Sequence, residues 1–345
     1  MENVAVKEYT GDSTEWDAFV QQHAEAKIYH LYRWREVIRE AFGHHSLYLA
    51  AYSGEELVGV LPLIIFKSSL FGKFLVSIPF FNYGGELVTS STVREAFYRY
   101  LQDWMREQDF QFIEFRHDHP IDTQLPVKQH KVTFLLSLPD DPEILWKALK
   151  AKVRSQVRRP LKEYMSAVVG SEELLDDYYT VFARNMRDLG TPVYAKKFFA
   201  TILKHFPEKA RLVVVYSKEK VPVAASFLLG FRNTIEIPWA SSVREYNRFS
   251  PNMLLYWKSF ETAIENGYTV FDFGRCTPGG GTYRFKKQWG GTEKPLYWYY
   301  ILPEGEELPQ INPENPRYEL AIKIWQRLPV WLTKLIGPGI IKHIP

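Results

Sequence analysis

Cysteine is nearly absent from this chain, since Cys276 is the only one in 345 residues. One cysteine excludes an internal disulfide framework and fits a protein of the reducing cytoplasm. It also excludes cysteine-rich zinc sites, and the histidines lack the spacing of zinc ligands. We interpret His117-Asp118-His119 as a polar loop at a strand end and expect no metal site.

Long apolar runs are missing as well. No segment approaches the roughly 20 apolar residues that a membrane-spanning helix requires, and Met1–Asp17 lack the apolar core of a signal peptide. The formal net charge of +3 is too small to indicate bulk nucleic-acid binding, so we expect no DNA partner. The expected location is the cytoplasm, either free or peripheral at the inner face of the cell membrane.

Several common signatures are also lacking: the Walker A phosphate loop, the G-x-G-x-x-G dinucleotide fingerprint and the G-x-S-x-G nucleophile elbow. Their absence argues against a P-loop nucleotidase, a Rossmann dehydrogenase and a serine hydrolase. Cys276 has no histidine near it in sequence, which argues against covalent catalysis by its thiol. A transferase-like site is the expectation that remains.

What the chain does contain is a repeated order of elements. Leu47–Phe115 predicts a hairpin, a strand, a helix and a strand, and Arg211–Phe273 predicts the same order. Within them, Glu107–Phe115 (EQDFQFIEF) aligns with Glu265–Phe273 (ENGYTVFDF). We infer a duplicated α/β domain in a chain longer than most single domains. The predicted divisions are a first domain at 1–140, a second at 141–303 with a helical entry segment, and an amphipathic tail at 304–345.

The stretch Val270–Gly291, VFDFGRCTPGGGTYRFKKQWGG, joins a strand to a Pro-Gly-Gly-Gly break that cannot continue a regular ladder. Asp272 lies at the predicted strand end, where α/β folds place ligands, and could accept a proton from an attacking amine or orient it. Lys286 and Lys287 suit a phosphate, a carboxylate or a developing oxyanion. The alternatives are that Asp272 and its counterpart Glu114 only tie loops, and that the lysines are solvated beside a tight turn.

A line of cations on a predicted helix is a second candidate. Lys150, Arg154, Arg158 and Lys162 recur every four residues, and no acidic residue occurs between Lys147 and Lys162. The line is typical of a contact for a pyrophosphate or an RNA backbone. It also fits a solvated helix face, and the sequence leaves both interpretations open.

The tail from Tyr318 to Pro345 alternates apolar residues and cations and is broken by Pro329 and Pro338. With Trp325 and Trp331 it is typical of an amphipathic segment that lies in a membrane interface. The alternative is a C-terminal helix that packs on the protein's own core.

Three segments together resemble the Fem family of peptidoglycan aminoacyl transferases. They resemble more closely the FemAB-related proteins associated with PEP-CTERM/exosortase and exopolysaccharide loci. The segments are the late DFGRCTPGGGTYRFKKQWG, the earlier FFNYGG and the basic KVRSQVRRPLK. The most specific element is F-K-x-x-[FW]-G, here Phe285, Lys286, Trp289 and Gly290. The resemblance covers the chain from Trp16 to the tail.

The resemblance implies two tandem GNAT-like acyltransferase domains of the α/β (α+β) class, each a mixed, mostly antiparallel sheet flanked by helices. It implies acyl transfer to an amine without a covalent enzyme intermediate, and Lys286 would stabilise negative charge at the donor carbonyl or phosphate. Asp272 and Lys286 are the expected catalytic residues. The expected substrate-binding residues are Asn82, Tyr83, Arg154, Arg158, Trp239, Arg275, Tyr283 and Lys287.

No tightly bound cofactor is expected, and the donor stays open between aminoacyl-tRNA and acyl-CoA. The long helical hairpin arm of some tRNA-using family members is missing, and Arg248–Asn252 occupy the place of the Q/R-x-x-G-x-G/A loop of CoA-using GNAT enzymes. The expected acceptor is a lipid-linked cell-envelope precursor, either a peptidoglycan peptide or an exopolysaccharide amino sugar. The rival functions are a CoA-dependent exopolysaccharide acyltransferase and a non-catalytic protein that binds a lipid-linked glycan.

Overall fold

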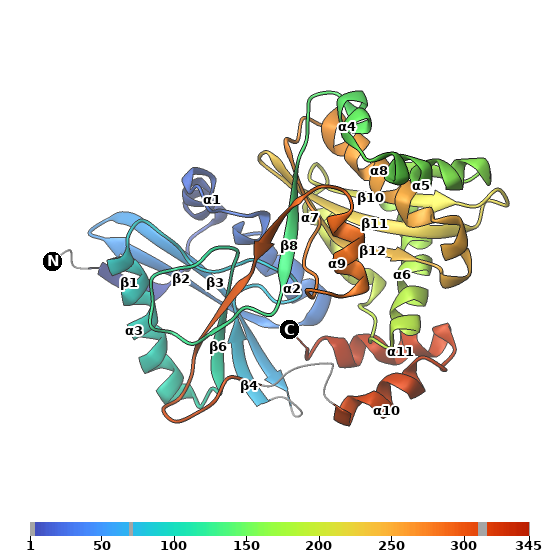
Figure 1. Ribbon diagram of the computed structural model, residues 1–345. Helices are drawn as coiled ribbons and strands as arrows, with labels where there is room; N and C mark the ends of the chain where they lie inside the picture. The colour runs from blue at the N-terminus through green and yellow to red at the C-terminus, as the bar shows by residue number, and fades with distance from the viewer. Residues whose placement is uncertain (1–3, 69–71, 310–315, 345) are drawn as a thin grey trace. The chain divides into compact units, whose positions relative to one another are not determined.

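The computed structural model describes residues 4–68, 72–309 and 316–344. The chain forms two compact units (Figure 1). The first unit comprises residues 1–130, 295–311 and 343–345, and the second comprises residues 131–294 and 312–342. Each unit is built around one sheet, and each is described by itself below.

The sheet of the first unit has the strand order β1-β2-β3-β4-β6-β15-β7, and β5 pairs with β3. Its hydrogen-bonded neighbours run antiparallel except β4 and β6, which run parallel. The strands are β1 (Val4–Glu8), β2 (His45–Ser53), β3 (Glu56–Ser68), β4 (Gly72–Val76), β5 (Leu87–Val88), β6 (Phe112–His117), β7 (Val127–Lys128) and β15 (Tyr297–Ile301).

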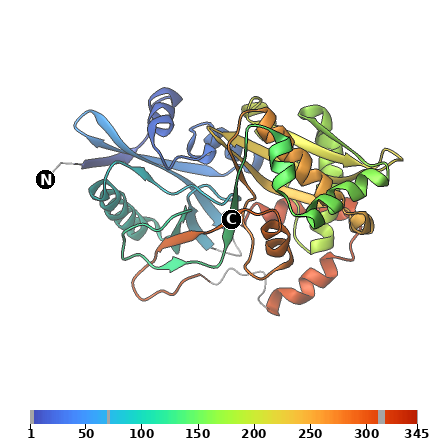
Figure 2. The same cartoon turned by 45° about the horizontal axis from the view of Figure 1, so that its top comes forward.

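Helices cover both faces of this sheet, because successive side chains of a strand point to opposite sides. On β2, Leu49 packs in one core with Phe97 of α3 (Ser91–Gln108). The preceding Tyr48 instead stacks on Trp16 of α1 (Ser13–Gln22), with ring centroids 5.0 Å apart. Figure 2 shows α1 and α3 on opposite sides of the sheet. The remaining helical pieces are a 3₁₀ turn (Ile28–His30) and α2 (Trp34–Phe42).

The sheet of the second unit has the order β14-β8-β13-β12-β11-β10-β9. Here β12 and β13 run parallel, whereas β9 to β12 are antiparallel neighbours and β8 is antiparallel to β13. The strands are β8 (Val132–Ser137), β9 (Ser166–Gly170), β10 (Ala210–Tyr216), β11 (Pro222–Phe231), β12 (Thr234–Ser242), β13 (Val270–Asp272) and β14 (Thr292–Pro295).

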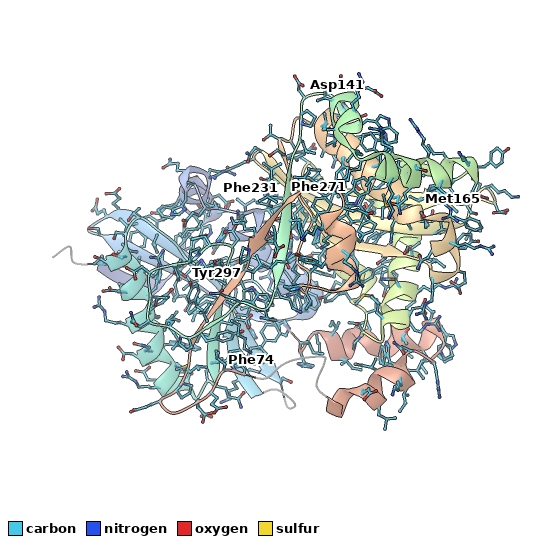
Figure 3. The ribbon with its side chains drawn as sticks, viewed as in Figure 1. Phe74, Asp141, Met165, Phe231, Phe271 and Tyr297 are labelled. Atoms are coloured by element: carbon cyan, nitrogen blue, oxygen red, sulfur yellow. The ribbon has the colours of Figure 1, made fainter. Side chains whose placement is uncertain are left out.

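Alternation again divides the helices of the second unit between two faces. Leu228 of β11 lies in one core with Phe260 of α8, and α4 and α5 pack on that helix. The neighbouring Phe227 contacts Tyr178 of α6 and Phe199 of α7. Figure 3 shows side chains filling the unit around Phe271 of β13. The helices are α4 (Pro142–Ala148), α5 (Ala151–Lys162), α6 (Leu175–Leu189), α7 (Lys196–His205), α8 (Pro251–Glu265), α9 (Gly281–Lys287), α10 (Pro316–Trp325) and α11 (Val330–Ile341), with 3₁₀ turns at Glu172–Leu174 and Arg244–Phe249.

The predicted duplication is confirmed by the strand orders. β2, β3, β4 and β6 follow one another in the first sheet, with α3 between β4 and β6 in sequence. β10, β11, β12 and β13 do the same in the second sheet, with α8 between β12 and β13. The closing pair is parallel in both copies. Each copy is thus a mixed, mostly antiparallel sheet flanked by helices, as expected.

The two copies exchange a strand. β8 follows the first copy in sequence but pairs with β13 of the second, and β15 follows the second copy but pairs with β6 of the first. By their contacts the two units therefore change at residues 130/131 and 294/295, whereas the divisions predicted from the sequence are 140/141 and 303/304. Most of the tail belongs to the second unit. Local patterns could not reveal this, because a strand's partner is chosen by tertiary structure.

The exchanged strand β15 carries a buried hydrogen bond whose loss can be measured. The Tyr300 hydroxyl donates to Glu114 Oε2 at 2.6 Å, and Arg116 Nε donates to Glu114 Oε1 at 2.7 Å. Tyr300→Phe leaves a buried carboxylate oxygen without this donor, so we expect the free energy of unfolding to fall by about 1–3 kcal/mol. Chemical denaturation measures it. Tyr297→Phe, in the same strand, is the matched control, and equal losses in both variants would contradict the assignment.

Candidate active site

The parallel strands β12 and β13 separate at a pair of buried carboxylates. They pair at Thr234 with Val270, Ile235 with Phe271 and Glu236 with Asp272, after which β13 ends and β12 continues to Ser242. Glu236 and Asp272 are each only 5% exposed. The end of a parallel strand is where α/β proteins place ligands. Glu236 was not predicted, because only the register between the strands brings it beside Asp272.

Asp272 holds the turn that follows β13. Its Oδ1 accepts a hydrogen bond from the Gly274 amide at 2.8 Å and lies 2.5 Å from Thr133 Oγ1, which comes from β8. Gly274 has a φ of +66°, a conformation that favours glycine. Asp272 therefore does tie a loop, which was the structural alternative, and the same contacts fix its carboxylate at the strand end.

Lys286 reaches the same turn from α9. Its Nζ donates to the carbonyl oxygens of Gly274 at 2.8 Å and Arg275 at 2.9 Å, and the residue is only 4% exposed. The aromatic residues around it explain the direction of its side chain. Phe285 packs on Tyr256 and Trp289 on Phe260, both from α8, with ring centroids 4.9 and 5.0 Å apart. These contacts anchor the short helix, so Lys286 is directed at the end of β13.

Burial lowers the pKa of Lys286 to about 8, although the nearby Cys276, Asp272 and Glu236 act in the opposite direction. The ammonium is therefore charged at neutral pH and loses its proton far more readily than an exposed lysine. Burial also raises the pKa of the Cys276 thiol, against the influence of Lys286. That thiol remains protonated at neutral pH, which agrees with the expectation of noncovalent chemistry.

Three further predicted residues belong to the same loop region. Tyr283 donates to Glu293 Oε2 at 2.5 Å, and Lys287 is exposed with its Nζ 5.4 Å from the centroid of the Tyr283 ring. Arg275 is half-buried and offers its backbone carbonyl to Lys286. Lys287 thus has the solvated setting that the sequence left open for both lysines, whereas Lys286 does not.

Trp239 lies among aromatic residues on the α7 side of the sheet. Its ring meets those of Phe199 and Phe227 edge-on, with centroids 5.2 and 5.7 Å apart. The residue is only half-buried. Packing therefore accounts for much of this side chain, and a stacking role toward a substrate stays a prediction.

The basic line is on α5, and its two arginines have internal partners. Arg154 Nη1 donates to the carbonyl oxygens of Leu149 and Lys147 at the end of α4, at 2.8 and 3.1 Å. The Arg158 guanidinium lies 5.1 Å from the centroid of a Trp146 ring. The exposed cations of the region without an ion pair to any described residue are Lys147, Lys150, Lys152, Arg158, Arg159 and Lys162. The charge available to a ligand is therefore mostly on lysines.

Asn82 and Tyr83 belong to the first unit, in a strained segment between β4 and β5. Both are buried, and Ile78 and Phe80 before them have φ values of +50° and +73°. The amides of Gly84 and Gly85 donate to the Arg116 carbonyl at 2.9 and 3.1 Å. Bulky residues rarely adopt such backbone angles unless the surrounding structure enforces them. The segment is thus held in one conformation, as a preformed binding loop would be.

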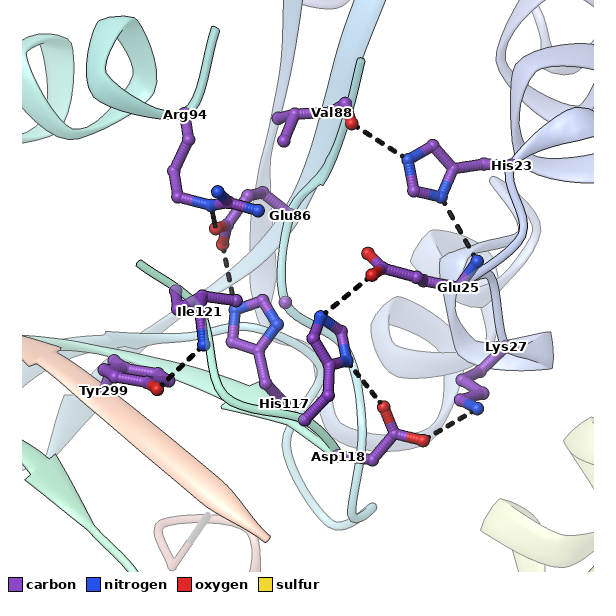
Figure 4. A network of polar contacts seen from close by, with 12 residues as sticks. His23, Glu25, Lys27, Glu86, Val88, Arg94, His117, Asp118, Ile121 and Tyr299 are labelled. Atoms are coloured by element: carbon purple, nitrogen blue, oxygen red, sulfur yellow. Dashed lines mark hydrogen bonds and ion pairs between the residues drawn. The ribbon is translucent and has the colours of Figure 1, made fainter. Parts of the chain in front are cut away.

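A polar network beside this segment was not predicted from sequence (Figure 4). The buried Glu86 accepts from Arg94 Nε and Tyr98 at 2.8 Å, and lies 3.1 Å from His117 Nε2. Burial raises the pKa of Glu86, but the charges of His117 and Arg94 outweigh it and lower the pKa to about 2. The members of the network satisfy one another, which is typical of a structural role.

The neighbouring His117-Asp118-His119 segment is engaged in ion pairs. Asp118 pairs with Lys27 at 2.8 Å (Figure 4). His119 pairs with both Asp118 and Glu25. Among the residues that the structure describes, no group of three or more histidine, cysteine or acidic side chains is placed to hold a metal ion. The segment forms polar contacts at the end of β6.

Comparison with known proteins agrees with this architecture. Residues 151–287 match the acetyltransferase (GNAT) domain family. A search among curated proteins gives no significant match. The structure of FemX superposes with a TM-score of 0.65 at 15% identity, covering 86% of this chain and 97% of FemX. The structure of L-PGS from Bacillus licheniformis superposes with a TM-score of 0.56 at 14% sequence identity, covering 94% of this chain and 97% of L-PGS. A tandem GNAT protein from the clavulanic acid biosynthesis pathway superposes with a TM-score of 0.56 at 11% sequence identity, covering 87% of this chain and 99% of that protein.

At these identities the solved structures establish the fold, which is the tandem GNAT fold predicted from the sequence. Residues 151–287, within the second unit, match the GNAT acetyltransferase domain, which supports an acyltransferase. The resemblance to the Fem family is confirmed at the level of the fold, because FemX shares the arrangement over most of both chains.

Proposed function

We propose that the protein is a FemAB-type N-acyltransferase, which transfers an aminoacyl or acyl group to an amine of a cell-envelope precursor. The observation that carries the proposal is the buried ammonium of Lys286 beside Asp272 and Glu236, where β12 and β13 separate. A fixed positive charge at this position suits an oxyanion that develops during acyl transfer, because it acts in a site of low dielectric.

The reaction assigns a role to each group. The acceptor amine attacks the donor carbonyl carbon, and the carbonyl oxygen becomes negatively charged. Two of the three N–H groups of Lys286 are used by Gly274 and Arg275, which leaves one for that oxygen. One of the two carboxylates where the strands separate, Asp272 of β13 or Glu236 of β12, would take the amine proton. The proton then passes to the leaving group, a tRNA hydroxyl or a CoA thiol, as the amide bond forms.

The donor is proposed as one of two kinds. The GNAT domain match favours acyl-CoA. CoA-using enzymes carry a glycine-rich loop at the position of the junction between β12 and α8. This chain lacks that loop there, which argues for aminoacyl-tRNA. Ser242 Oγ lies 2.9 Å from Asn247 Oδ1 and 3.1 Å from Asn252 Nδ2 there, so side chains fill the turn. The acceptor we favour is a lipid-linked precursor, either a peptidoglycan peptide or an exopolysaccharide amino sugar.

The donor question has a direct test, since a ligand that binds only the folded protein raises its melting temperature. We expect either CoA or a charged-tRNA analogue to raise it, and a lipid-pyrophosphate analogue to raise it further. Thermal denaturation with each compound alone and in pairs measures this. A shift with the lipid-pyrophosphate analogue alone would favour the non-catalytic glycan-binding function and contradict the transferase.

Lys286 should contribute far more to transfer than Lys287. Replacing Lys286 with alanine removes the buried charge, and we expect kcat/KM to fall by roughly 10²-fold or more, the scale for one oxyanion-stabilising group. Lys287→Ala is the matched control, because Lys287 is exposed and contacts Tyr283. The measurement is amide formation with the donor found above. Equal, mild effects in both variants would mean that neither lysine takes part in transfer and that both are solvated residues beside a turn.

The basic face of α5 is proposed to bind phosphate groups of the donor or acceptor. The plot of log affinity against log salt concentration has a negative slope, and Lys150→Ala/Lys162→Ala should make it shallower by about one or more. The reason is that binding releases fewer counterions when fewer phosphate contacts form. Arg154 and Arg158 are unsuitable targets, since their loss also removes contacts with α4. Lys218→Ala/Lys220→Ala, on the β10–β11 turn, is the control of equal charge. An unchanged slope in the α5 variant would mean that these cations are solvated surface charge and do not bind phosphate.

A further inference from the structure

Large apolar side chains are exposed at high density on the C-terminal helices. Twelve such residues are exposed in the described chain, and six of them lie between residues 320 and 340. Scattered exposed apolar residues need no explanation, but a concentrated patch marks an interaction surface. The six are Leu320, Ile324, Trp331, Leu335, Ile336 and Ile340.

The way α11 packs explains why its largest residues face outward. Thr333, Gly337 and Ile341 are buried and recur every four residues, so they form one stripe. α11 packs on α6, and at Gly337 its backbone approaches Val193 so closely that a Cβ would lie 2.9 Å from the Val193 nitrogen. The helix is thus attached by its small residues. Trp331 and Leu335, on another side, are 67% and 71% exposed.

α10 also packs on the second unit, and the two tryptophans of the tail differ in their exposure. Trp325 is buried at 9% exposure, whereas Trp331 is exposed. Ile322 packs against Gly190 at the end of α6, and Arg187 Nη1 donates to the Leu328 carbonyl at 3.0 Å. The two interpretations of the tail therefore apply to different residues: one tryptophan packs on the protein, and the other is available to a partner.

Charge indicates the kind of partner. Glu319 of α10 pairs with Lys323 at 2.6 Å, and from Leu320 to Pro345 the chain has no acidic residue but has Arg327, Lys334 and Lys342 as further cations. Arg327 is exposed and makes no ion pair with a described residue. A second copy of the chain would bring like charges together, whereas a negatively charged bilayer surface is complementary to them. Tryptophan also prefers the headgroup layer of a bilayer.

We propose that α10 and α11 form a membrane-binding surface for anionic phospholipid bilayers, with Trp331 and Leu335 inserted among the headgroups. Attachment in the plane of the membrane is the mode that fits, because no helix of the described residues is long and apolar enough to cross a bilayer. The surface is separate from the basic face of α5, since α11 packs on α6 and α5 packs on α8, on the other face of the sheet. The proposal does not rest on the proposed function.

Co-sedimentation of the full chain with vesicles tests the proposal. We expect the wild-type protein to pellet with vesicles of mixed phosphatidylcholine and phosphatidylglycerol, and to do so less with phosphatidylcholine alone. Trp331→Ser/Leu335→Ser should lower the partition coefficient by roughly tenfold or more, because two large apolar side chains no longer enter the bilayer. Both residues are exposed, so the variant keeps its core.

Leu161→Ser/Tyr164→Ser is the matched control, since these residues are exposed beside the basic face of α5. It should bind vesicles as the wild type does. The proposal is overturned if the wild type stays in the supernatant, or if binding is lost in the control and kept in the α11 variant. It is also overturned if, without vesicles, the wild type sediments as a dimer that the α11 variant converts to monomers. Melting shifts with the donors report the acyltransferase site separately.

Discussion

Gly274 is held through both its N–H and its carbonyl, and the geometry of the candidate site depends on these two hydrogen bonds. Its N–H donates to Asp272 and its carbonyl accepts from Lys286, both at 2.8 Å. The turn is thereby fixed between β13 and α9, although the chain between them is rich in glycine. In the proposed reaction, a site so arranged offers a positive charge and a carboxylate to the donor carbonyl and the attacking amine without reorganising.

The duplication places comparable residues in different chemical surroundings. Glu114 occupies the position in the first copy that Asp272 occupies in the second. Its carboxylate is used by Arg116 and Tyr300 in a buried network, whereas Asp272 binds an amide and a threonine hydroxyl. Equivalent positions of the duplicated fold thus carry carboxylates with different partners.

The sequence predicted whatever is encoded locally. The repeat, the strand end at Asp272 and the F-K-x-x-W element all follow from patterns within a few residues, and the structure has them. It could not predict features that depend on strand register or on partners distant in sequence. Glu236 becomes a site residue only through its register with β13, and β8 and β15 are exchanged between the copies. Arg154 looked available to a phosphate because the α4 carbonyls that it binds belong to tertiary structure. Similarly, periodicity alone could not show which tail tryptophan is buried.

The central claim is that Lys286 is a buried ammonium with a lowered pKa at the reaction centre. A titration of the protein with its lysines labelled by carbon-13 at Cε, followed by NMR, measures this most directly. The account predicts one lysine that titrates near pH 8, that is missing in Lys286→Arg and that changes when the acyl donor binds. All lysines titrating near the ordinary value of about 10.4, or a low-pKa lysine indifferent to the donor, would contradict it.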